Sequence, residues 1–435
     1  MRRPLIILLL ASLAALAAPA GAHAGYVPGE VVVGVEGQAE PKVVQLPAGE
    51  SVGEAVRELR RRDGVAYAVP NHIARASGFI PNDPGRGGRG GWQRIQWNFL
   101  APVGINAPDA WANLLAAGRP GGRGAKVAVL DTGVAYRSTR RFRRSPDFVG
   151  TRFATGYDFV DRDRLPDDEN GHGTFVAGVI AERVNNGRAL TGIAYGATIM
   201  PVRVLDEQGL GDAVAIARGI RFAARTGAHI INLSLEFDSS VPASQIPEVL
   251  SAIRYATRRG ALVVGASGNE ALRIVAYPAR ANGVLSVGAT TEHLCQAEYS
   301  NDGRGLDIVA PGGGADAAIE EDPEHCRPNG RPGRDIFQLT FLGSVRRFGL
   351  PGGYQGTSMA APHVSGVAAL VVASGVIGRR PTPRAIEDRL KATARDLGPP
   401  GPDERYGAGL VDAAKATTPT PSLRAAWKRR AARRR

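Results

Sequence analysis

The sequence predicts an α/β fold in which a doubly wound, mostly parallel sheet is flanked by helices and preceded by a small α+β domain. From about residue 95 to 416, short apolar segments of strand length alternate with helical stretches. This alternation is typical of parallel strands joined by crossover helices. The chain has 435 residues, 43% of them hydrophobic and 22% charged. Such a chain is long enough for two or three domains and is unlike one that is disordered throughout.

The first 24 residues have the parts of an export signal. Two arginines precede an apolar run from Leu5 to about Ala18, and the triplet AHA at 22–24 forms a cleavage site between small residues. The run is shorter than the roughly 20 apolar residues that span a bilayer, which favours a signal peptide over a membrane anchor. We therefore expect a secreted or cell-envelope protein.

A small α+β unit follows the signal, over 25–77. It combines a strand from Glu30 to Val35, an amphipathic helix from Val52 to Arg62 and a strand from Val65 to Val69. The Pro/Gly/Arg-rich sequence PNDPGRGGRGG then predicts a linker, over 78–94, with no packed core of its own.

The main domain is expected over 95–416. Its predicted strands are Lys126 to Leu130, Thr198 to Val204, His229 to Leu233, Ala261 to Gly265, Val284 to Gly288 and Leu306 to Val309.

The C-terminal segment, 417–435, is strongly basic. Formal net charge is +13, and seven of the positive charges lie in the last twelve residues. Such runs are usually solvated and disordered, although their charge also suits an anionic envelope or a nucleic acid.

Three motifs present residues that could carry chemistry. VAVLDTGV places Asp131 at the carboxyl end of a buried strand, where reacting groups collect in parallel sheets. NGHGTFVAGVIA places His172 between glycines, which would let a substrate backbone approach, at the start of a helix. GTSMAAPHVSGVAALVV places Ser358 at the start of an apolar helix. Taken singly, each residue also suits a structural role, such as a helix cap.

Together the motifs identify a resemblance. Asp, His and Ser follow one another in the order found in subtilisin, and GTSMAAPHVSG is highly specific. Further landmarks are SVGAT (286–290), YSNDG (299–303), VAPGG (309–313) and YGAGLVDA (406–413). From about residue 95 to 416 the chain resembles the subtilisin-like serine proteases, or subtilases, which implies a serine endopeptidase with polypeptide substrates and a subtilisin-like fold.

The residues fit that chemistry. A neutral serine hydroxyl is a poor nucleophile, so His172 must take the proton of Ser358 while Asp131 orients the imidazole and stabilises its cation. The resemblance makes Asn269, in ASGNE, the side-chain donor to the oxyanion, beside the Ser358 backbone N–H. His363 lies one turn further along the Ser358 helix and is expected to point away.

The resemblance also implies that residues 25–77 are an inhibitory propeptide. VPGEVVVGV begins it, and VAYAVPNHIARAS resembles the strand and tail that enter the active site. Such a segment assists folding, inhibits the enzyme as a product would, and is removed by self-cleavage. An unrelated N-terminal domain is the alternative. We expect a monomer.

Two cysteines, Cys295 and Cys326, suit a disulfide because an exported chain meets an oxidising environment. Closing that loop of roughly 32 residues would stabilise the fold by about 3 to 4 kcal/mol on the chain-entropy model. A pair of free buried thiols is the alternative.

Two groups of oxygen-bearing side chains suit calcium, which prefers six to eight hard oxygen ligands. Asp147 and Asn186 resemble the tight calcium site of the family. The acidic segment with Asp158, Asp161 and Asp163 resembles a second calcium loop, although intervening arginines oppose it and a solvated charged loop is the alternative. We expect calcium as a structural ion and no organic cofactor.

The resemblance assigns the substrate-binding segments as well. They are Ser234-Leu235-Glu236 and Ala266-Ser267-Gly268, which line the pocket for the residue before the scissile bond, and Gly209-Leu210-Gly211, the edge that pairs with extended substrate.

Two positions of this pocket depart from the family. Glu236 stands where glycine is common and would attract Arg or Lys at the rim, by no more than several-fold because exposed ion pairs contribute only about 0 to 1 kcal/mol. Ala276 replaces a glycine of the pocket floor and would disfavour large aromatic side chains. The alternative is that Glu236 turns to solvent and the enzyme is unselective.

Two other classes of protein share features with this sequence. A binding protein on the same fold that has lost catalysis is disfavoured, because all four catalytic positions are intact. A dinucleotide-binding protein is suggested by GGRGAKVAVLDTG, but these glycines precede the strand, whereas a phosphate-binding loop must follow one.

Overall fold

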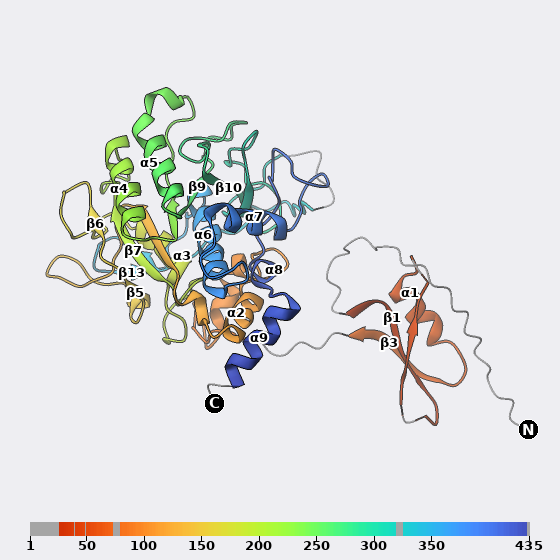
Figure 1. Cartoon of the computed structure of the whole chain (residues 1–435). Helices are drawn as coiled ribbons and strands as arrows, with labels where there is room; N and C mark the ends of the chain where they lie inside the picture. The colour runs from red at the N-terminus through yellow and green to blue at the C-terminus, as the bar shows by residue number, and fades with distance from the viewer. Residues whose placement is uncertain (1–25, 39, 48, 73–78, 319–324, 433–435) are drawn as a thin grey trace, which may run out of the picture. The chain divides into compact units, whose positions relative to one another are not determined.

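The computed structural model describes residues 26–38, 40–47, 49–72, 79–318 and 325–432. These residues form two compact units, which divide between Ser77 and Gly78 (Figure 1). The predicted signal peptide, 1–24, lies outside the described residues.

The N-terminal unit is an antiparallel sheet with one helix packed against it. The strands β1 (Tyr26–Val35), β2 (Lys42–Gln45) and β3 (Val65–His72) pair in the order β2-β1-β3, and α1 (Val52–Leu59) contacts β1 and β3. Alternating residues of β1 point toward the helix. The core consists of Val31, Val33, Val52, Ala55, Val56 and Ala68. Strand β2 was not predicted, because it is only four residues long and mostly exposed.

The second unit is built on an eight-stranded sheet in the order β11-β10-β9-β8-β4-β7-β5, with β6 also paired to β7. Every one of these strand pairs is parallel, which confirms the predicted fold class. The strands are β4 (Lys126–Asp131), β5 (Arg152–Phe153), β6 (Tyr157–Asp158), β7 (Thr198–Arg203), β8 (Ile230–Leu233), β9 (Leu262–Ala266), β10 (Val284–Thr290) and β11 (Ile308–Pro311). A separate two-stranded pair joins β12 (Thr340–Phe341) to β13 (Phe348–Gly349).

Helices cover both faces of this sheet. In β4, Val127 and Val129 face a core shared with α2 (Ala107–Ala116), α3 (His172–Ala181), α6 (Thr357–Ser374), α7 (Pro383–Thr393) and α8 (Ala413–Thr417). The alternate residues, Ala128 and Leu130, face a second core shared with α4 (Ala213–Arg225) and α5 (Pro247–Arg258). Figure 1 shows α4 and α5 side by side and α6 nearer the centre.

Helix α6 is the central element of the first core. It is long and apolar enough to cross a membrane by composition, yet it is largely buried and contacts β8, β9, β10 and β11. Gly366 permits this packing, because a Cβ there would lie 2.9 Å from the Cβ of Ile193. The helix is therefore a core helix of this unit.

The expectation of an unpacked linker is corrected by the structure. Trp92 is fully buried among aromatic side chains, and its Nε1 donates to the Pro81 carbonyl at 2.8 Å. Asp83 is buried as well and accepts hydrogen bonds from the backbone N–H groups of Asn185 and Asn186. Residues 79–94 thus belong to the second unit, because one buried indole outweighs the loop-forming composition around it.

The expectation of a disordered C-terminal tail is also corrected. Residues Pro421–Ala432 form helix α9, which contacts α2. Alanine and arginine are strong helix formers, and Trp427 is only 4% exposed. Burial of that side chain holds the helix against the domain.

The predicted disulfide between Cys295 and Cys326 is present, with the two Cα atoms 4.3 Å apart. Both cysteines are buried.

Candidate active site

Asp131 is the last residue of β4 and is fully buried. Its Oδ1 accepts the backbone N–H of Thr132 at 2.8 Å and lies 2.7 Å from His172 Nδ1. The next turn requires Gly133, whose φ is +107° and where a Cβ would lie 2.5 Å from the Asp167 carbonyl oxygen. The strand thus ends with a carboxylate aimed at the imidazole.

His172 begins helix α3 after Gly171, which has a φ of +108°. The sequence suggested that the flanking glycines admit the substrate backbone. The structure instead shows Gly173 packed against the loop after β4, because a Cβ there would lie 2.1 Å from the Gly133 carbonyl oxygen. This close approach brings His172 to Asp131.

Asp168 holds the first residues of α3 through hydrogen bonds. It is buried and accepts hydrogen bonds from the backbone N–H groups of Asn170, Gly171 and Thr174, and from the hydroxyl groups of Thr132 and Thr174. A carboxylate at this position stabilises the helix N-terminus through hydrogen bonds and through the helix dipole. In the sequence, nothing distinguishes Asp168 from the other aspartates of this acidic segment.

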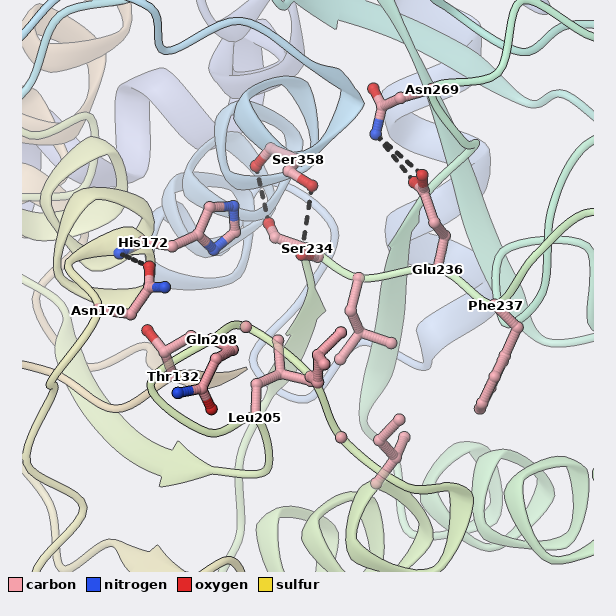
Figure 2. A pocket seen from close by; sticks show the side chains of 15 residues that line it. Thr132, Asn170, His172, Leu205, Gln208, Ser234, Glu236, Phe237, Asn269 and Ser358 are labelled. Atoms are coloured by element: carbon pink, nitrogen blue, oxygen red, sulfur yellow. Dashed lines mark hydrogen bonds between the residues drawn. The ribbon is translucent and has the colours of Figure 1, made fainter.

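Ser358 is the second residue of α6, at the N-terminal end of a helix whose first backbone N–H groups have no partner within the helix. Its Oγ donates to the Ser234 carbonyl at 3.2 Å, and Figure 2 shows its side chain in the same pocket as the His172 imidazole. Hydrogen bonds between a nucleophile and its base often tighten only when substrate binds.

Asn269 follows β9 and is anchored at its carbonyl end. Its Oδ1 accepts the Thr357 backbone N–H at 2.8 Å and the Thr357 hydroxyl at 3.1 Å. This orientation leaves the Nδ2 amide to act as a donor. In this structure Nδ2 donates to the carboxylate of Glu236, at 2.9 and 3.2 Å from its two oxygens.

The pocket has a volume of about 410 Å³ and brings together most of the predicted site. His172, Asn269 and Ser358 line it, as do the predicted segments 209–211 and 234–236. Residues that sequence reasoning missed also line it, namely Thr132, Asn170, Leu205, Gln208, Ile216 and Phe237. The apolar ones resemble ordinary core residues in the sequence, so no local signal could have singled them out.

The remaining predicted pocket residues lie behind this surface. Ala266, Ser267 and Ala276 are buried, and Ala276 donates its N–H to the Ser267 carbonyl at 2.7 Å. A Cβ on Gly268 would lie 3.2 Å from the Ala276 Cβ. These residues pack against one another and are not among the residues that line the pocket.

The electrostatics of the pocket are dominated by carboxylates. Burial, the largest single effect, lowers the pKa of His172, but the negative charges of Asp131, Asp168 and Glu236 and the hydrogen bond to Asp131 outweigh it and raise that pKa above 6.5. Burial raises the pKa of Glu236, although its hydrogen bonds with Asn269 oppose the shift.

His363, the other histidine on α6, faces the interior. Its Nδ1 donates to the Met359 carbonyl at 2.8 Å, which leaves Nε2 to accept from the Asn98 amide at 2.7 Å. Burial lowers the pKa of His363 to about 4. His363 is therefore a neutral, buried core residue and is not placed to act as the base for Ser358.

The acidic segment predicted as a calcium loop does not fit that ion. The Arg203 guanidinium lies 2.9 Å from Asp158 Oδ2 and 2.7 Å from Asp161 Oδ2, and so supplies the positive charge itself. Asp163 accepts the backbone N–H of Leu165. These carboxylates are therefore already paired with groups of the protein itself.

The pair Asp147 and Asn186 fits calcium better. Asn186 Nδ2 donates to Asp147 Oδ1 at 3.2 Å, and burial, with the nearby charge of Asp83, raises the pKa of Asp147 to about 6. Burial and the charges of Asp147 and Asp83 also raise the pKa of Glu182. Within the described residues, no three His, Cys, Asp or Glu side chains gather as they would around a metal ion. A cation here would therefore need backbone or side-chain carbonyl oxygens as further ligands. Its positive charge would offset the negative charges of three buried carboxylates, those of Asp83, Asp147 and Glu182.

A serine at a helix N-terminus, in the same pocket as an imidazole that contacts an aspartate, is the arrangement of a serine hydrolase. Comparison with protein families supports the assignment to the serine hydrolases and narrows it to one family. Residues 122–409 match the model of the subtilase family. The chain belongs to the subtilase family of serine endopeptidases.

Individual relatives support this membership. Subtilisin Savinase from Lederbergia lenta is 37% identical over 300 residues, which cover 68% of this chain and 91% of that protein. M-protease from Shouchella clausii is 37% identical over 300 residues, which cover 68% of this chain and 65% of that protein, slightly less than two thirds of its length.

Solved structures show the same fold. A protease from Pseudoalteromonas arctica aligns with a TM-score of 0.61 at 30% identity, over 78% of this chain and 99% of that one. A cold-adapted subtilisin-like serine proteinase aligns with a TM-score of 0.52 at 29% identity, over 67% of this chain and 89% of that one.

The raised pKa of His172 predicts the pH dependence of peptide hydrolysis. The imidazole must be neutral to accept a proton, so kcat/KM should fall as the pH drops through the His172 pKa, with a midpoint above 6.5. Glu236→Gln removes one negative charge and should move that midpoint to lower pH. Glu404→Gln, which removes an exposed carboxylate paired with Arg273, should not move it. A midpoint below 6.5 in the unmodified enzyme would contradict this electrostatic account.

The anchoring of Asn269 predicts the effect of removing its amide. Asn269→Ala should lower kcat by about 100- to 1000-fold, the range known for loss of the corresponding amide in subtilisin. Steady-state kinetics on one peptide substrate would measure the change. Turnover equal to that of the unmodified enzyme would refute the oxyanion role.

Proposed function

We propose that this chain is a secreted serine endopeptidase that acts through Asp131, His172 and Ser358 and matures by cleaving its own N-terminal segment. The observation that carries the proposal is the 2.7 Å contact between His172 Nδ1 and Asp131 Oδ1, in the pocket where the N-terminus of α6 presents Ser358. Support for export comes from the signal-like residues 1–24 and from the disulfide.

The proposed reaction begins when Ser358 Oγ attacks the carbonyl carbon of the scissile peptide and passes its proton to His172 Nε2. Asp131 accepts the hydrogen bond from Nδ1 and stabilises the imidazolium. The tetrahedral oxyanion accepts hydrogen bonds from the Asn269 amide and the Ser358 backbone N–H. His172 then protonates the leaving amine, and water, activated by the same imidazole, hydrolyses the acyl-enzyme.

Polypeptide substrates suit the shape of this pocket. The 209–211 segment lies on its wall, and the Leu210 side chain is 68% exposed. Exposed backbone at such an edge can pair with an extended peptide, whose main-chain hydrogen bonds provide affinity with little dependence on sequence.

The N-terminal unit is proposed to be the inhibitory propeptide. Support comes from its own hydrophobic core and from its forming a compact unit by itself. The residues that would enter the active site, 73–77, lie outside the described residues.

Two further proposals concern partners. We expect a monomer, and we propose that helix α9, on which Arg424 and Arg429 are exposed, contacts an anionic envelope.

Removing the nucleophile tests the proposed function most simply. Ser358→Ala should abolish peptide hydrolysis and leave the segment up to residue 77 covalently attached, because the precursor can no longer cut itself. Intact-mass spectrometry of the secreted protein measures both. Ser422→Ala, an exposed serine on α9, is the matched control and should be processed normally. A Ser358→Ala protein that still loses its N-terminal segment would contradict self-cleavage.

Calcium at Asp147 and Asn186 is proposed as a stabilising ion. An ion that binds only the folded state stabilises it by mass action. A chelator should therefore shorten the half-life of activity at elevated temperature while leaving the initial rate unchanged. Asp147→Asn should shorten the half-life and remove the effect of the chelator, whereas Asp161→Asn should keep that effect. Equal half-lives across calcium concentrations would refute the calcium proposal.

A further inference from the structure

The side chain of Glu236 accepts hydrogen bonds from the same amide nitrogen that the oxyanion needs. Both carboxylate oxygens lie within hydrogen-bond distance of Asn269 Nδ2, at 2.9 and 3.2 Å, as the dashed lines in Figure 2 show. The amide cannot simply turn away, because its Oδ1 is held by the backbone N–H and the hydroxyl of Thr357. Before substrate binds, the amide is thus held at its oxygen by Thr357 and at its nitrogen by the Glu236 carboxylate.

This contact has an electrostatic consequence for catalysis. An oxyanion that forms beside Asn269 must share the amide with a second anion, and two like charges that lie close together repel each other. Glu236 is partly buried, so this repulsion is screened less than it would be at an open surface. The carboxylate both orients the amide and opposes the charge that the amide is meant to stabilise.

The pocket supplies no fixed cation to offset Glu236. Among the residues that line it, His172 and Glu236 are the only titratable ones, and His172 must be neutral to act as the base. No Lys or Arg among the described residues forms an ion pair with Glu236. Glu236 follows Ser234 and Leu235, which also line the pocket, so a basic substrate side chain that enters there could supply the missing positive charge.

We propose that Glu236 is a positioning and specificity-determining residue whose carboxylate holds the Asn269 amide until a substrate Arg or Lys, at the position before the scissile bond, pairs with it and releases the amide to the oxyanion. This inference rests on the proposed function. It differs from simple attraction at the pocket rim, because the basic side chain then accelerates acylation as well as binding. The preference should appear in kcat.

The test uses two peptides that differ only in arginine or citrulline before the scissile bond. Citrulline has nearly the shape of arginine but no charge. Single-turnover kinetics on the mature enzyme measure the rate of acylation, and steady-state kinetics measure kcat and KM. A hydrogen bond to a charged group is about twice as strong as a neutral one, so we expect the arginine peptide to be acylated roughly 5- to 10-fold faster.

Glu236→Gln keeps an acceptor for Asn269 but removes the charge. It should raise the acylation rate of the citrulline peptide and bring the arginine-to-citrulline ratio of kcat close to one. Glu404→Gln is the matched control, because it removes an exposed carboxylate that pairs with Arg273 and makes no hydrogen bond to the amide. It should keep the ratio of the unmodified enzyme. In an Asn269→Ala background, Glu236→Gln should no longer change the ratio of kcat.

Three results would overturn the inference and leave the proposed function intact. The first is a preference for arginine confined to KM, and the second is an equal loss of kcat for both peptides in Glu236→Gln, which would make Glu236 only a structural support. The third is hydrolysis of casein without cleavage of either peptide. Hydrolysis of neither peptide nor casein would instead contradict the proposed function itself.

Discussion

The hydrogen bond between Asp131 and His172 depends on two elements that are distant in sequence and meet at one edge of the sheet. Strand β4 ends at the aspartate and helix α3 begins at the histidine, 2.7 Å away. Gly133 and Gly173 allow the two backbones to approach closely enough. The doubly wound sheet explains why this meeting is possible, because the carboxyl ends of parallel strands gather at one edge.

The same edge collects three carboxylates whose negative charges act on one imidazole. Asp131, Asp168 and Glu236 all raise the pKa of His172, against the opposing effect of burial. Each carboxylate has a different local task, since Asp131 orients the ring, Asp168 holds the start of α3 and Glu236 holds the Asn269 amide. The negative charges of the pocket therefore favour the protonated form of His172. In the proposed mechanism they would stabilise the imidazolium, while Glu236 would add a charge that opposes the oxyanion.

Much of the fold, and the residues that the structure brings together in the candidate site, could be predicted from the sequence for a physical reason. Asp131, His172 and Ser358 lie in local motifs whose glycines and apolar residues are required by the turns and helices that hold them. Contacts between distant segments leave no such local signal. The burial of Trp92 and Trp427, the pairing of Arg203 with Asp158 and the contact of Glu236 with Asn269 all depend on how separate elements pack.

The central claim is that Ser358 is a nucleophile activated by His172, and covalent labelling tests it most directly. A sulfonyl fluoride reacts with an activated serine hydroxyl, and the added mass can be located by peptide mapping. The account predicts a label on Ser358 in the unmodified enzyme and none at comparable rate in His172→Ala, because a neutral serine is a poor nucleophile without its base. A label on another residue, or equal labelling of Ser358 without His172, would contradict it.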